Sequence, residues 1–207
     1  MPSPEDASDV AVRPAVRIEE ISAATFDGAR VVTNEFLGAG KSVCCVPLWC
    51  FPASQGEFNS HFELQYEEAL KTTAVAVRES DDRVIGIMKT AIHGQARSAA
   101  DRGMHETRPG ECYIEFLAVA SDARGQGVGT RLLKWAEELA LSRGCNVLTL
   151  GVMNGNPAGR LYQRFGFIRK REGDPCNAMA ACLFTSCFIG CPNGVPGGQQ
   201  MEKPLHY

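Results

Sequence analysis

The sequence predicts a single domain of the α/β (α+β) class, in which strands and helices share one core. Its 207 residues, 44% of them hydrophobic, are enough to bury a core, and no apolar run approaches the roughly 20 residues of a membrane span. Two apolar segments, 74–78 and 84–89, have the pattern of an antiparallel hairpin. A third ends in a glycine-rich turn and continues as an amphipathic helix, over 117–133. These three observations together predict the fold class.

The N-terminal half predicts a strand, two helices and the hairpin. Residues 16–21 partly alternate between apolar and polar and suit a first strand. Ser22 can cap a helix whose apolar residues recur at helical spacing as far as Phe36. After a segment broken by prolines, residues 57–71 place apolar side chains near one helical face. The hairpin strands flank the polar connection 79–83, so we expect them to pair antiparallel.

The C-terminal half predicts strands that alternate with helices. Residues 113–120 form the central strand, and the helix after its glycine turn ends at Gly144, a left-handed stop. A helix crosses between the central strand and the strand over 146–152, so we expect these two strands to be parallel. A short helix over 157–165 and a last strand over 198–205 complete the sheet.

Two segments lie outside this core pattern. We expect residues 1–14 to form a disordered tail, because the start of the chain is rich in Pro, Ser and acidic residues. The domain then covers 15–207, with a Cys-rich insertion at about 174–197. The cysteines of this insertion form no C-x-x-C pair and have no histidine nearby, so no metal is expected.

Net charge and cysteine content indicate which partners the protein can bind and in which cell compartment we expect it. A formal net charge of −3 gives no basic field for nucleic acid. Nine cysteines form an odd count without repeating spacing, which fits reduced thiols in a cytoplasmic protein better than a disulfide framework. Without a secretory signal or an apolar span, we expect neither export nor a membrane partner. The sequence leaves the oligomeric state open.

The glycine-rich turn predicts an anion site built from the main chain. Gly125, Gly127 and Gly129 allow the backbone to approach a ligand closely, and the first N–H groups of the following helix point at that ligand. A dinucleotide fingerprint is excluded, because its third glycine would have to stand where the chain has Thr130 or Leu132. The turn therefore belongs to another class of phosphate site.

Two motifs narrow that class. The first is Arg124-x-x-Gly127-x-Gly129, which follows Leu117-x-Val119. The second is Asn156-Pro-Ala-Gly-Arg-Leu-Tyr-Gln-Arg-Phe-Gly-Phe167, one helix and one strand downstream. Together they resemble the acetyl-CoA loop and the N…A…LYxxxGF segment of the GNAT superfamily of N-acetyltransferases. The resemblance implies the GNAT acyltransferase fold, a mixed and mostly antiparallel sheet of about six to seven strands flanked by about four helices.

The resemblance also implies a site for acetyl-CoA as co-substrate. In the family, backbone N–H groups of the strand before the turn bind the oxyanion, and the matching residues are Leu117 and Val119. The residues expected to bind the CoA pyrophosphate are Arg124, Gly125, Gln126, Gly127, Val128, Gly129 and Thr130. Arg124 either complements a phosphate charge or is an exposed turn residue. Asn156 resembles the family asparagine near the pantetheine arm, although Asn154 stands in the same loop.

Acetyl transfer further requires a base for the amine and a proton for the departing thiolate. Tyr162 matches the family tyrosine beside the thioester sulfur. Alternatively, it only packs as a buried aromatic residue beside Phe165. Glu115 is the expected base, and it would accept the proton of the amine directly or through water. Alternatively, its carboxylate has no part in the reaction and is paired with a nearby arginine or faces solvent. Tyr113 is the second choice of base. Strand alternation predicts Tyr113, Glu115 and Leu117 on one face.

The predicted function is transfer of an acetyl group from acetyl-CoA to a primary amine, by direct attack in a ternary complex. The sequence leaves open whether the amine belongs to a small molecule, a peptide N-terminus or a lysine. A catalytically silent acyl-CoA-binding or regulatory domain on the same fold is the alternative, because a fold alone does not give activity.

Overall fold

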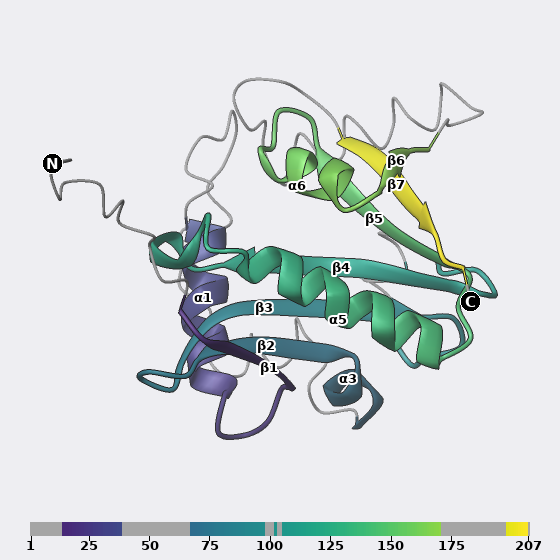
Figure 1. Cartoon of the computed structure of the whole chain (residues 1–207). Helices are drawn as coiled ribbons and strands as arrows, with labels where there is room; N and C mark the ends of the chain where they lie inside the picture. The colour runs from purple at the N-terminus through teal and green to yellow at the C-terminus, as the bar shows by residue number, and fades with distance from the viewer. Residues whose placement is uncertain (1–13, 39–66, 98–101, 103–104, 171–197, 207) are drawn as a thin grey trace, which may run out of the picture.

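One mixed sheet of seven strands organises the part of the chain that the computed structural model describes (Figure 1). The described residues are 14–38, 67–97, 102, 105–170 and 198–206. The strands are β1 (Val16–Glu20), β2 (Thr73–Arg78), β3 (Arg83–Ile92), β4 (Glu111–Val119), β5 (Val147–Met153), β6 (Ile168–Arg169) and β7 (Gly198–Pro204). The helices are α1 (Phe26–Gly38), α3 (Glu67–Lys71), α5 (Val128–Ser142) and α6 (Ala158–Arg164), with a 3-10 turn, η1 (Ser121–Ala123).

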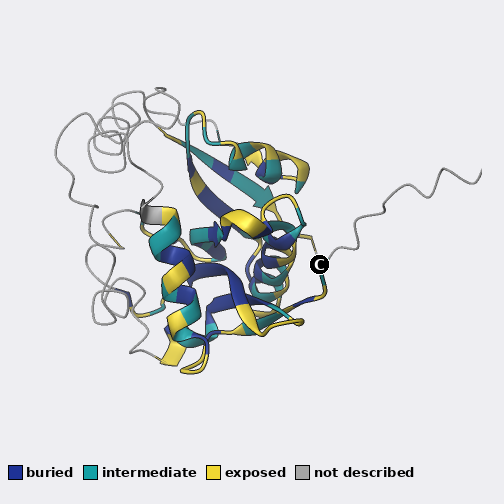
Figure 2. Ribbon diagram, turned by 90° about the vertical axis from the view of Figure 1, so that its left-hand side faces the viewer, coloured by how far each residue is buried: buried dark blue, intermediate teal, exposed yellow. Residues whose placement is uncertain are grey.

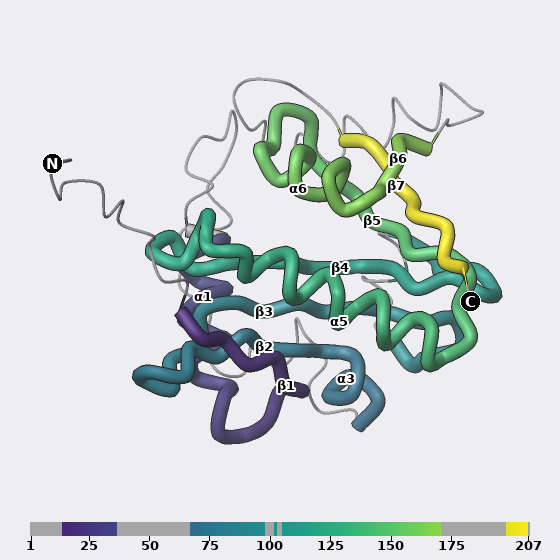
Figure 3. Tube along the Cα trace, viewed as in Figure 1, coloured from purple at the N-terminus to yellow at the C-terminus, as the bar shows by residue number. Residues whose placement is uncertain are grey.

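The strands lie in the order β1-β2-β3-β4-β5-β7-β6. β1 to β4 pair antiparallel, which confirms the predicted hairpin of β2 and β3. β4 and β5 pair parallel, as the crossing helix α5 predicts. β7 pairs antiparallel with β5, and β6 pairs antiparallel with the other edge of β7 (Figure 3). The fold is the mixed, mostly antiparallel α/β arrangement that the motifs imply.

Helices α1 and α5 cover opposite faces of the sheet (Figure 2). On one face Gly28 of α1 lies so close to β3 that a Cβ there would stand 2.7 Å from Val84. On the other face a Cβ on Gly86 would stand 3.1 Å from both Leu132 and Val128 of α5. Small residues on helix and strand therefore set the spacing of these layers.

The pairing of β3 with β4 contains a bulge at Glu115. Lys89 stands opposite Phe116, and the next residue of β3, Thr90, stands opposite Ile114. Glu115 is therefore the extra residue of β4. A bulge of this kind bends its strand and changes the direction in which a side chain points.

The bulge separates Tyr113 and Leu117 onto different faces of the sheet. Tyr113 stands opposite Ala91 and Leu117 opposite Met88, three positions apart on β3, so that the two side chains point in opposite directions. The expectation that they share a face is wrong, because strand alternation alone does not include the extra residue. Tyr113 faces away from α5, and Leu117 faces toward it.

Several predicted boundaries change in the structure. Helix α1 begins after Ser22: the carbonyl of Thr25 accepts the N–H of Ala29 at 2.9 Å, and Ser22 belongs to the preceding turn. Gly144 adopts a left-handed conformation with φ 71° and stops α5 as predicted. Of the helix expected over 57–71, the structure describes α3 only. The expected tail, apart from Pro14, and the Cys-rich insertion lie outside the described residues.

No helix in the described part of the chain is both long and apolar enough to cross a bilayer.

Candidate active site

The glycine-rich turn forms an open cradle at the start of α5. Gly125 and Gly127 have φ of 77° and 86°, and a Cβ on either would meet nothing within 4 Å. Gly127 precedes α5, and no side chain caps the helix there. The first N–H groups of a helix without a cap need a partner, and an anion supplies one. These backbone groups and the space in front of them fit a pyrophosphate.

Two side chains of the cradle form hydrogen bonds with backbone carbonyl groups of the residues just before it. Arg124 Nε donates to the carbonyl oxygen of Val119 at 3.1 Å, and Gln126 Nε2 donates to that of Asp122 at 2.7 Å. Val128 is buried against Gly86, so that its backbone is the part that can face a ligand. An anion placed in the cradle would therefore meet mainly main-chain groups.

Strands β4 and β5 separate beside the cradle, and we call this divergence the fork. Their last pair is Ile114 with Leu150, after which the two strands run apart (Figure 1). The N–H of Ala120 donates to β3 at 2.9 Å. Because N–H groups alternate along a strand, those of Leu117 and Val119 point to the other edge, into the fork. Both residues predicted to bind the oxyanion thus present their amides where β5 no longer pairs with β4.

Helix α6 brings Tyr162 to the same side of the sheet as the cradle. A Cβ on Gly129 would stand 2.9 Å from Leu161 Cδ2, so that the missing side chain allows α5 and α6 to approach closely. Tyr162 is buried and meets Phe167 edge-on at 6.0 Å between ring centroids. Its burial raises the pKa of the phenol to about 12. Among the described residues its hydroxyl has no hydrogen-bond partner, and it keeps its proton at neutral pH.

Asn156 helps to start α6. Its Oδ1 accepts the N–H of Ala158 at 2.9 Å, and its backbone N–H donates to Met153 at 3.1 Å. The structure thus gives the side-chain oxygen a local role, and the contact with a pantetheine arm stays a prediction.

Glu115 lies between two cations on the face away from α5. Lys89 Nζ is 2.9 Å from Oε2, and Arg97 Nε donates to Oε1 at 2.8 Å, with its Nη2 on the same oxygen. The three side chains are 9%, 6% and 5% exposed, for Glu115, Lys89 and Arg97 respectively. The bulge gives the carboxylate its direction, and the cations offset the cost of burying it. Pairing with an arginine, the alternative role for Glu115, is what the structure shows.

A second buried carboxylate, Glu111, holds His105 against Tyr113. Glu111 Oε1 lies 2.9 Å from His105 Nε2 and accepts the hydroxyl of Thr149 at 2.5 Å, while the N–H of Arg108 donates to Oε2 at 2.8 Å. Burial by itself raises the pKa of Glu111, but these hydrogen bonds outweigh it and hold the pKa at about 2. The His105 ring stacks on Tyr113 with centroids 4.0 Å apart.

Sequence reasoning did not find this second group. His105 and Arg97 stand in a polar loop without a motif, so that nothing local joins them to the central strand. A usable signal was Glu111, an acidic residue at the start of an apolar strand, because a buried carboxylate requires a partner.

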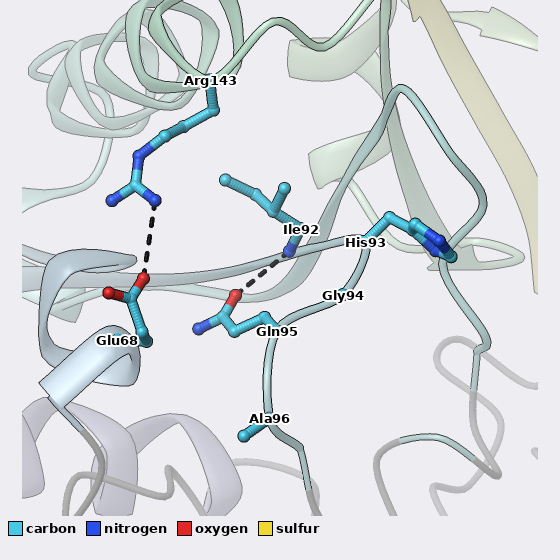
Figure 4. Close-up of a pocket in the computed structure, with 7 residues that line it drawn as sticks. All are labelled: Glu68, Ile92, His93, Gly94, Gln95, Ala96 and Arg143. Atoms are coloured by element: carbon cyan, nitrogen blue, oxygen red, sulfur yellow. Dashed lines mark hydrogen bonds and ion pairs between the residues drawn. The ribbon is translucent and has the colours of Figure 1, made fainter.

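A pocket of about 280 Å³ opens elsewhere (Figure 4). Its lining residues are Glu68, Ile92, His93, Gly94, Gln95, Ala96 and Arg143. Arg143 and Glu68 face each other across it, with Nη1 and Oε2 3.5 Å apart. Ile92 pairs with Cys112 near the start of β4, at the end of the strand away from the fork. This pocket is therefore separate from the cradle.

Neither metal nor thiol chemistry stands out in the described part of the chain. No cluster of three or more His, Cys, Asp or Glu side chains among those residues is arranged to hold a metal ion. Cys112 and Cys145 are free and buried, and burial raises the pKa of Cys112 to about 12. A thiol in that state is unreactive.

Comparison with known proteins identifies the family of the chain. The family described as "Acetyltransferase (GNAT) family" matches residues 44–167. The chain belongs to this GNAT family. "Acetyltransferase Atu2258" of Agrobacterium fabrum is 33% identical to this GNAT chain over 112 residues, which are 52% of the chain and 79% of that relative.

Two further likenesses cover different shares of the chain. A "Thialysine N-epsilon-acetyltransferase" of Bos taurus is 40% identical over 67 residues, 31% of this chain and 39% of that relative. The solved structure of a GCN5-related N-acetyltransferase from Kribbella flavida superposes with a TM-score of 0.62 and 18% identity, covering 92% of this chain and 98% of that one. At this identity the structural likeness shows the GNAT fold alone.

Proposed function

We propose that this GNAT chain transfers an acetyl group from acetyl-CoA to a primary amine, by direct attack of the amine in a ternary complex. The observation that carries the proposal is the fork: the amides of Leu117 and Val119 point into the divergence of β4 and β5, beside a cradle that suits a pyrophosphate. Acetyl-CoA, when bound, supplies an activated thioester. The residues of the chain supply position, charge stabilisation and proton transfer.

The Leu117 and Val119 amides stabilise the negative charge that develops on the thioester oxygen. They belong to a strand that β3 holds in place, so that the donors do not have to reorganise during the reaction. Their side chains pack in the core, and their N–H groups donate hydrogen bonds to the oxyanion. Arg124 to Thr130 hold the pyrophosphate, mainly through the backbone.

Tyr162 supplies the proton for the departing thiolate. Its phenol is protonated at neutral pH because burial raises its pKa to about 12, and its helix adjoins the cradle through Leu161 and Gly129. A protonated donor beside the sulfur is what a leaving thiolate requires.

Glu115 takes the proton of the amine, and it does so through water. Both of its oxygens already face the cations of Lys89 and Arg97. Oε2 is also buried and accepts no hydrogen bond from the described residues, so that an ammonium group cannot reach it directly. Water at the edge of the pair can carry the proton to the carboxylate. Its exposed fraction of 9% leaves little room for a larger group.

The test combines acetyl-CoA binding with thiol release over a panel of peptides, polyamines and arylamines. Gly127→Glu places a carboxylate in the cradle, and Gly94→Glu is its matched control, because Gly94 has φ 84° and likewise nothing within 4 Å of a Cβ. We expect Gly127→Glu to lose about tenfold or more in acetyl-CoA affinity, and Gly94→Glu to bind like the wild type.

The outcomes separate the two function classes. Binding and turnover by the wild type support the acetyltransferase. Tight binding without turnover on any amine supports the silent acyl-CoA-binding domain, and equal binding by the two glutamate variants contradicts the cradle. The expected cytoplasmic location stays a prediction from the sequence.

A further inference from the structure

Lys203 of β7 connects α5 with the end of α6. Its Nζ lies 2.6 Å from Oε1 of Glu137, a residue of α5. The same ammonium group lies over the ring of Phe165, the residue that ends α6, at 4.1 Å from the ring centroid. Lys203 thus contacts one helix through an ion pair and the other through a cation–π interaction. The two helices carry different parts of the proposed site, because α5 begins at the cradle and α6 contains Tyr162.

The stem of the Lys203 side chain lies beside the turn that ends α6. Its Cε and Cδ are 3.5 Å and 3.8 Å from where a Cβ on Gly166 would stand. The side chains of Lys203 and Glu137 are 20% and 28% exposed, so that water surrounds the ion pair only in part. An ion pair in such a setting is screened less than one on the open surface. The contact is therefore suited to hold two elements at a fixed separation.

Phe165 and Phe167 lead from the Lys203 ammonium group to the ring of Tyr162. The rings of Phe165 and Phe167 have centroids 6.3 Å apart, and Phe167 meets Tyr162 edge-on at 6.0 Å. The N–H of Phe167 also donates to the carbonyl oxygen of Tyr162 at 3.0 Å. Tyr162 and Phe167 are buried, and a close-packed interior transmits the displacement of one side chain to its neighbours. The position of Phe165 is thereby linked to that of the Tyr162 phenol.

The sheet alone does not fix the phenol relative to the cradle. The cradle follows β4, whereas Tyr162 lies in the segment that follows β5, and these two strands separate at the fork. Helices α5 and α6 approach each other at Gly129 and Leu161, near the cradle. Glu137 stands about two turns further along α5, roughly 12 Å from Gly129 along the axis. A second contact at this distance from the first opposes tilting of α6 on α5, and Lys203 supplies it.

Proton donation to the thiolate depends steeply on this geometry. In the proposed reaction the O–H bond of Tyr162 breaks as an S–H bond forms on the departing CoA, and solvent returns a proton to the phenolate. A misplacement of about 1 Å between reacting groups can cost on the order of a hundredfold in rate. A residue that sets the position of α6 therefore sets the rate of this step.

We propose that Lys203 is a positioning residue for acetyl transfer. Held by Glu137 on α5 and by Phe165 at the end of α6, it fixes the distance between the Tyr162 hydroxyl and the cradle. Lys203 acts through Tyr162 and takes no part in making or breaking bonds. This inference rests on the proposed function and adds to its site a residue of β7, which lies outside both sequence motifs.

The test is a double-mutant cycle between Lys203 and Tyr162. Lys203→Met removes the ammonium group and keeps an unbranched stem beside Gly166. The substitution is made in the wild type and in Tyr162→Phe, and the single-turnover rate is measured at saturating acetyl-CoA with the amine that the wild type acetylates fastest. Lys71→Met is the matched control, because Lys71 forms an ion pair of similar length, 2.8 Å, with Glu67. Thermal unfolding and acetyl-CoA affinity check that the fold and the cradle are intact.

We expect Lys203→Met to slow acetyl transfer about tenfold and to leave acetyl-CoA affinity within about twofold of the wild type. In Tyr162→Phe the same substitution should change the rate by less than about twofold, because no proton donor is left to position. Lys203→Arg keeps the charge and should recover part of the rate. Glu137→Gln removes the other half of the ion pair and should lose a similar factor, with little further loss when it is combined with Lys203→Met. Lys71→Met should act like the wild type.

Equal losses from Lys203→Met with and without the Tyr162 hydroxyl would show that Lys203 only stabilises the fold, and they overturn the inference. Wild-type rates in both Lys203→Met and Glu137→Gln overturn it as well. If Lys203→Met does not fold, Glu137→Gln in the same two backgrounds decides between these outcomes. Full turnover by Tyr162→Phe removes the phenol as proton donor, and this inference with it, while acetyl transfer itself stands. Absence of turnover on any amine by an acetyl-CoA-bound wild type instead overturns the proposed function together with this inference.

Discussion

Glu35 of α1 accepts a hydrogen bond from the backbone N–H of Ser121, with 2.7 Å between Oε1 and the nitrogen. Ser121 opens η1, the turn that leads from β4 into the cradle, and this hydrogen bond holds the pKa of Glu35 below its ordinary value. The next residue, Asp122, is bound by Arg83 at 2.7 Å. Two elements from the N-terminal half thus fix the entrance of the cradle that we propose for acetyl-CoA.

Removing the Glu35 carboxylate should loosen the cradle. We expect Glu35→Ala to weaken acetyl-CoA binding by about threefold to tenfold, because an exposed hydrogen bond such as this one contributes roughly 1 kcal/mol. Glu35→Gln keeps a carbonyl oxygen for the Ser121 N–H and should recover part of the affinity. Isothermal titration measures both variants. Equal affinities for the alanine variant and the wild type would show that η1 holds its place without α1.

Gly28 should tolerate no side chain, because α1 approaches β3 most closely there. A Cβ would stand 2.8 Å from the Cβ of Val84, which cannot move without moving its strand. We expect Gly28→Ala to lower the free energy of unfolding by roughly 1–3 kcal/mol. Gly159→Ala is the matched control in a helix, where a Cβ meets nothing within 4 Å, and it should be neutral or stabilising. Urea unfolding distinguishes them, and similar values for both would contradict the close packing.

The Glu111 network should make stability depend on pH in the acid range. The pKa of this carboxyl falls from an ordinary 4.5 to about 2 in the folded chain. A lowered folded-state pKa stabilises the fold above 4.5, and that stabilisation is lost as the pH falls through about 2. It is worth roughly 3 kcal/mol.

Comparison with Glu111→Gln isolates this effect from other carboxyl groups. We expect the variant to be less stable than the wild type near neutral pH, and the difference to shrink progressively as the pH is lowered from 4.5 toward 2. Denaturant unfolding at several pH values measures it. A difference that stays constant over this range would mean that Glu111 does not gain its stability from being ionised.

Glu115→Gln tests the proposed route of the proton. If Glu115 accepts the amine proton through water, kcat/KM should fall about a hundredfold and the acidic limb of its pH profile should disappear. Acetyl-CoA affinity is the control, since Glu115 faces away from the cradle. A profile that keeps its acidic limb removes Glu115 from proton transfer and leaves it as the partner of Lys89 and Arg97.

The elements that sequence predicted well are those whose signals are local. The strand, glycine turn and helix from Leu117 to Leu133 stand in one continuous segment, so that spacing and glycine positions indicate the cradle directly. The parallel pairing of β4 with β5 follows from the crossing helix. The position of Tyr162 on a short helix follows in the same way, because its motif lies one helix and one strand after the first, whereas its part in the reaction stays a prediction.

The parts that sequence could not predict depend on register between distant segments. The bulge at Glu115 appears only when Lys89 and Thr90 are placed opposite β4, and it changes the face of Leu117. Likewise, the stacking of His105 on Tyr113 joins a loop residue to a strand with no pattern connecting them. Such contacts arise from tertiary packing, and a periodicity does not contain them.

Direct transfer at the fork is tested most directly by following an isotopically labelled acetyl group from acetyl-CoA by mass spectrometry, in a single turnover with alaninamide and the wild-type chain. The account predicts labelled acetyl on the amine, and at no time on the protein, because the amine attacks the thioester in a ternary complex. Labelled protein that later passes its acetyl group to the amine, or labelled acetyl-CoA that stays bound and intact, would contradict it.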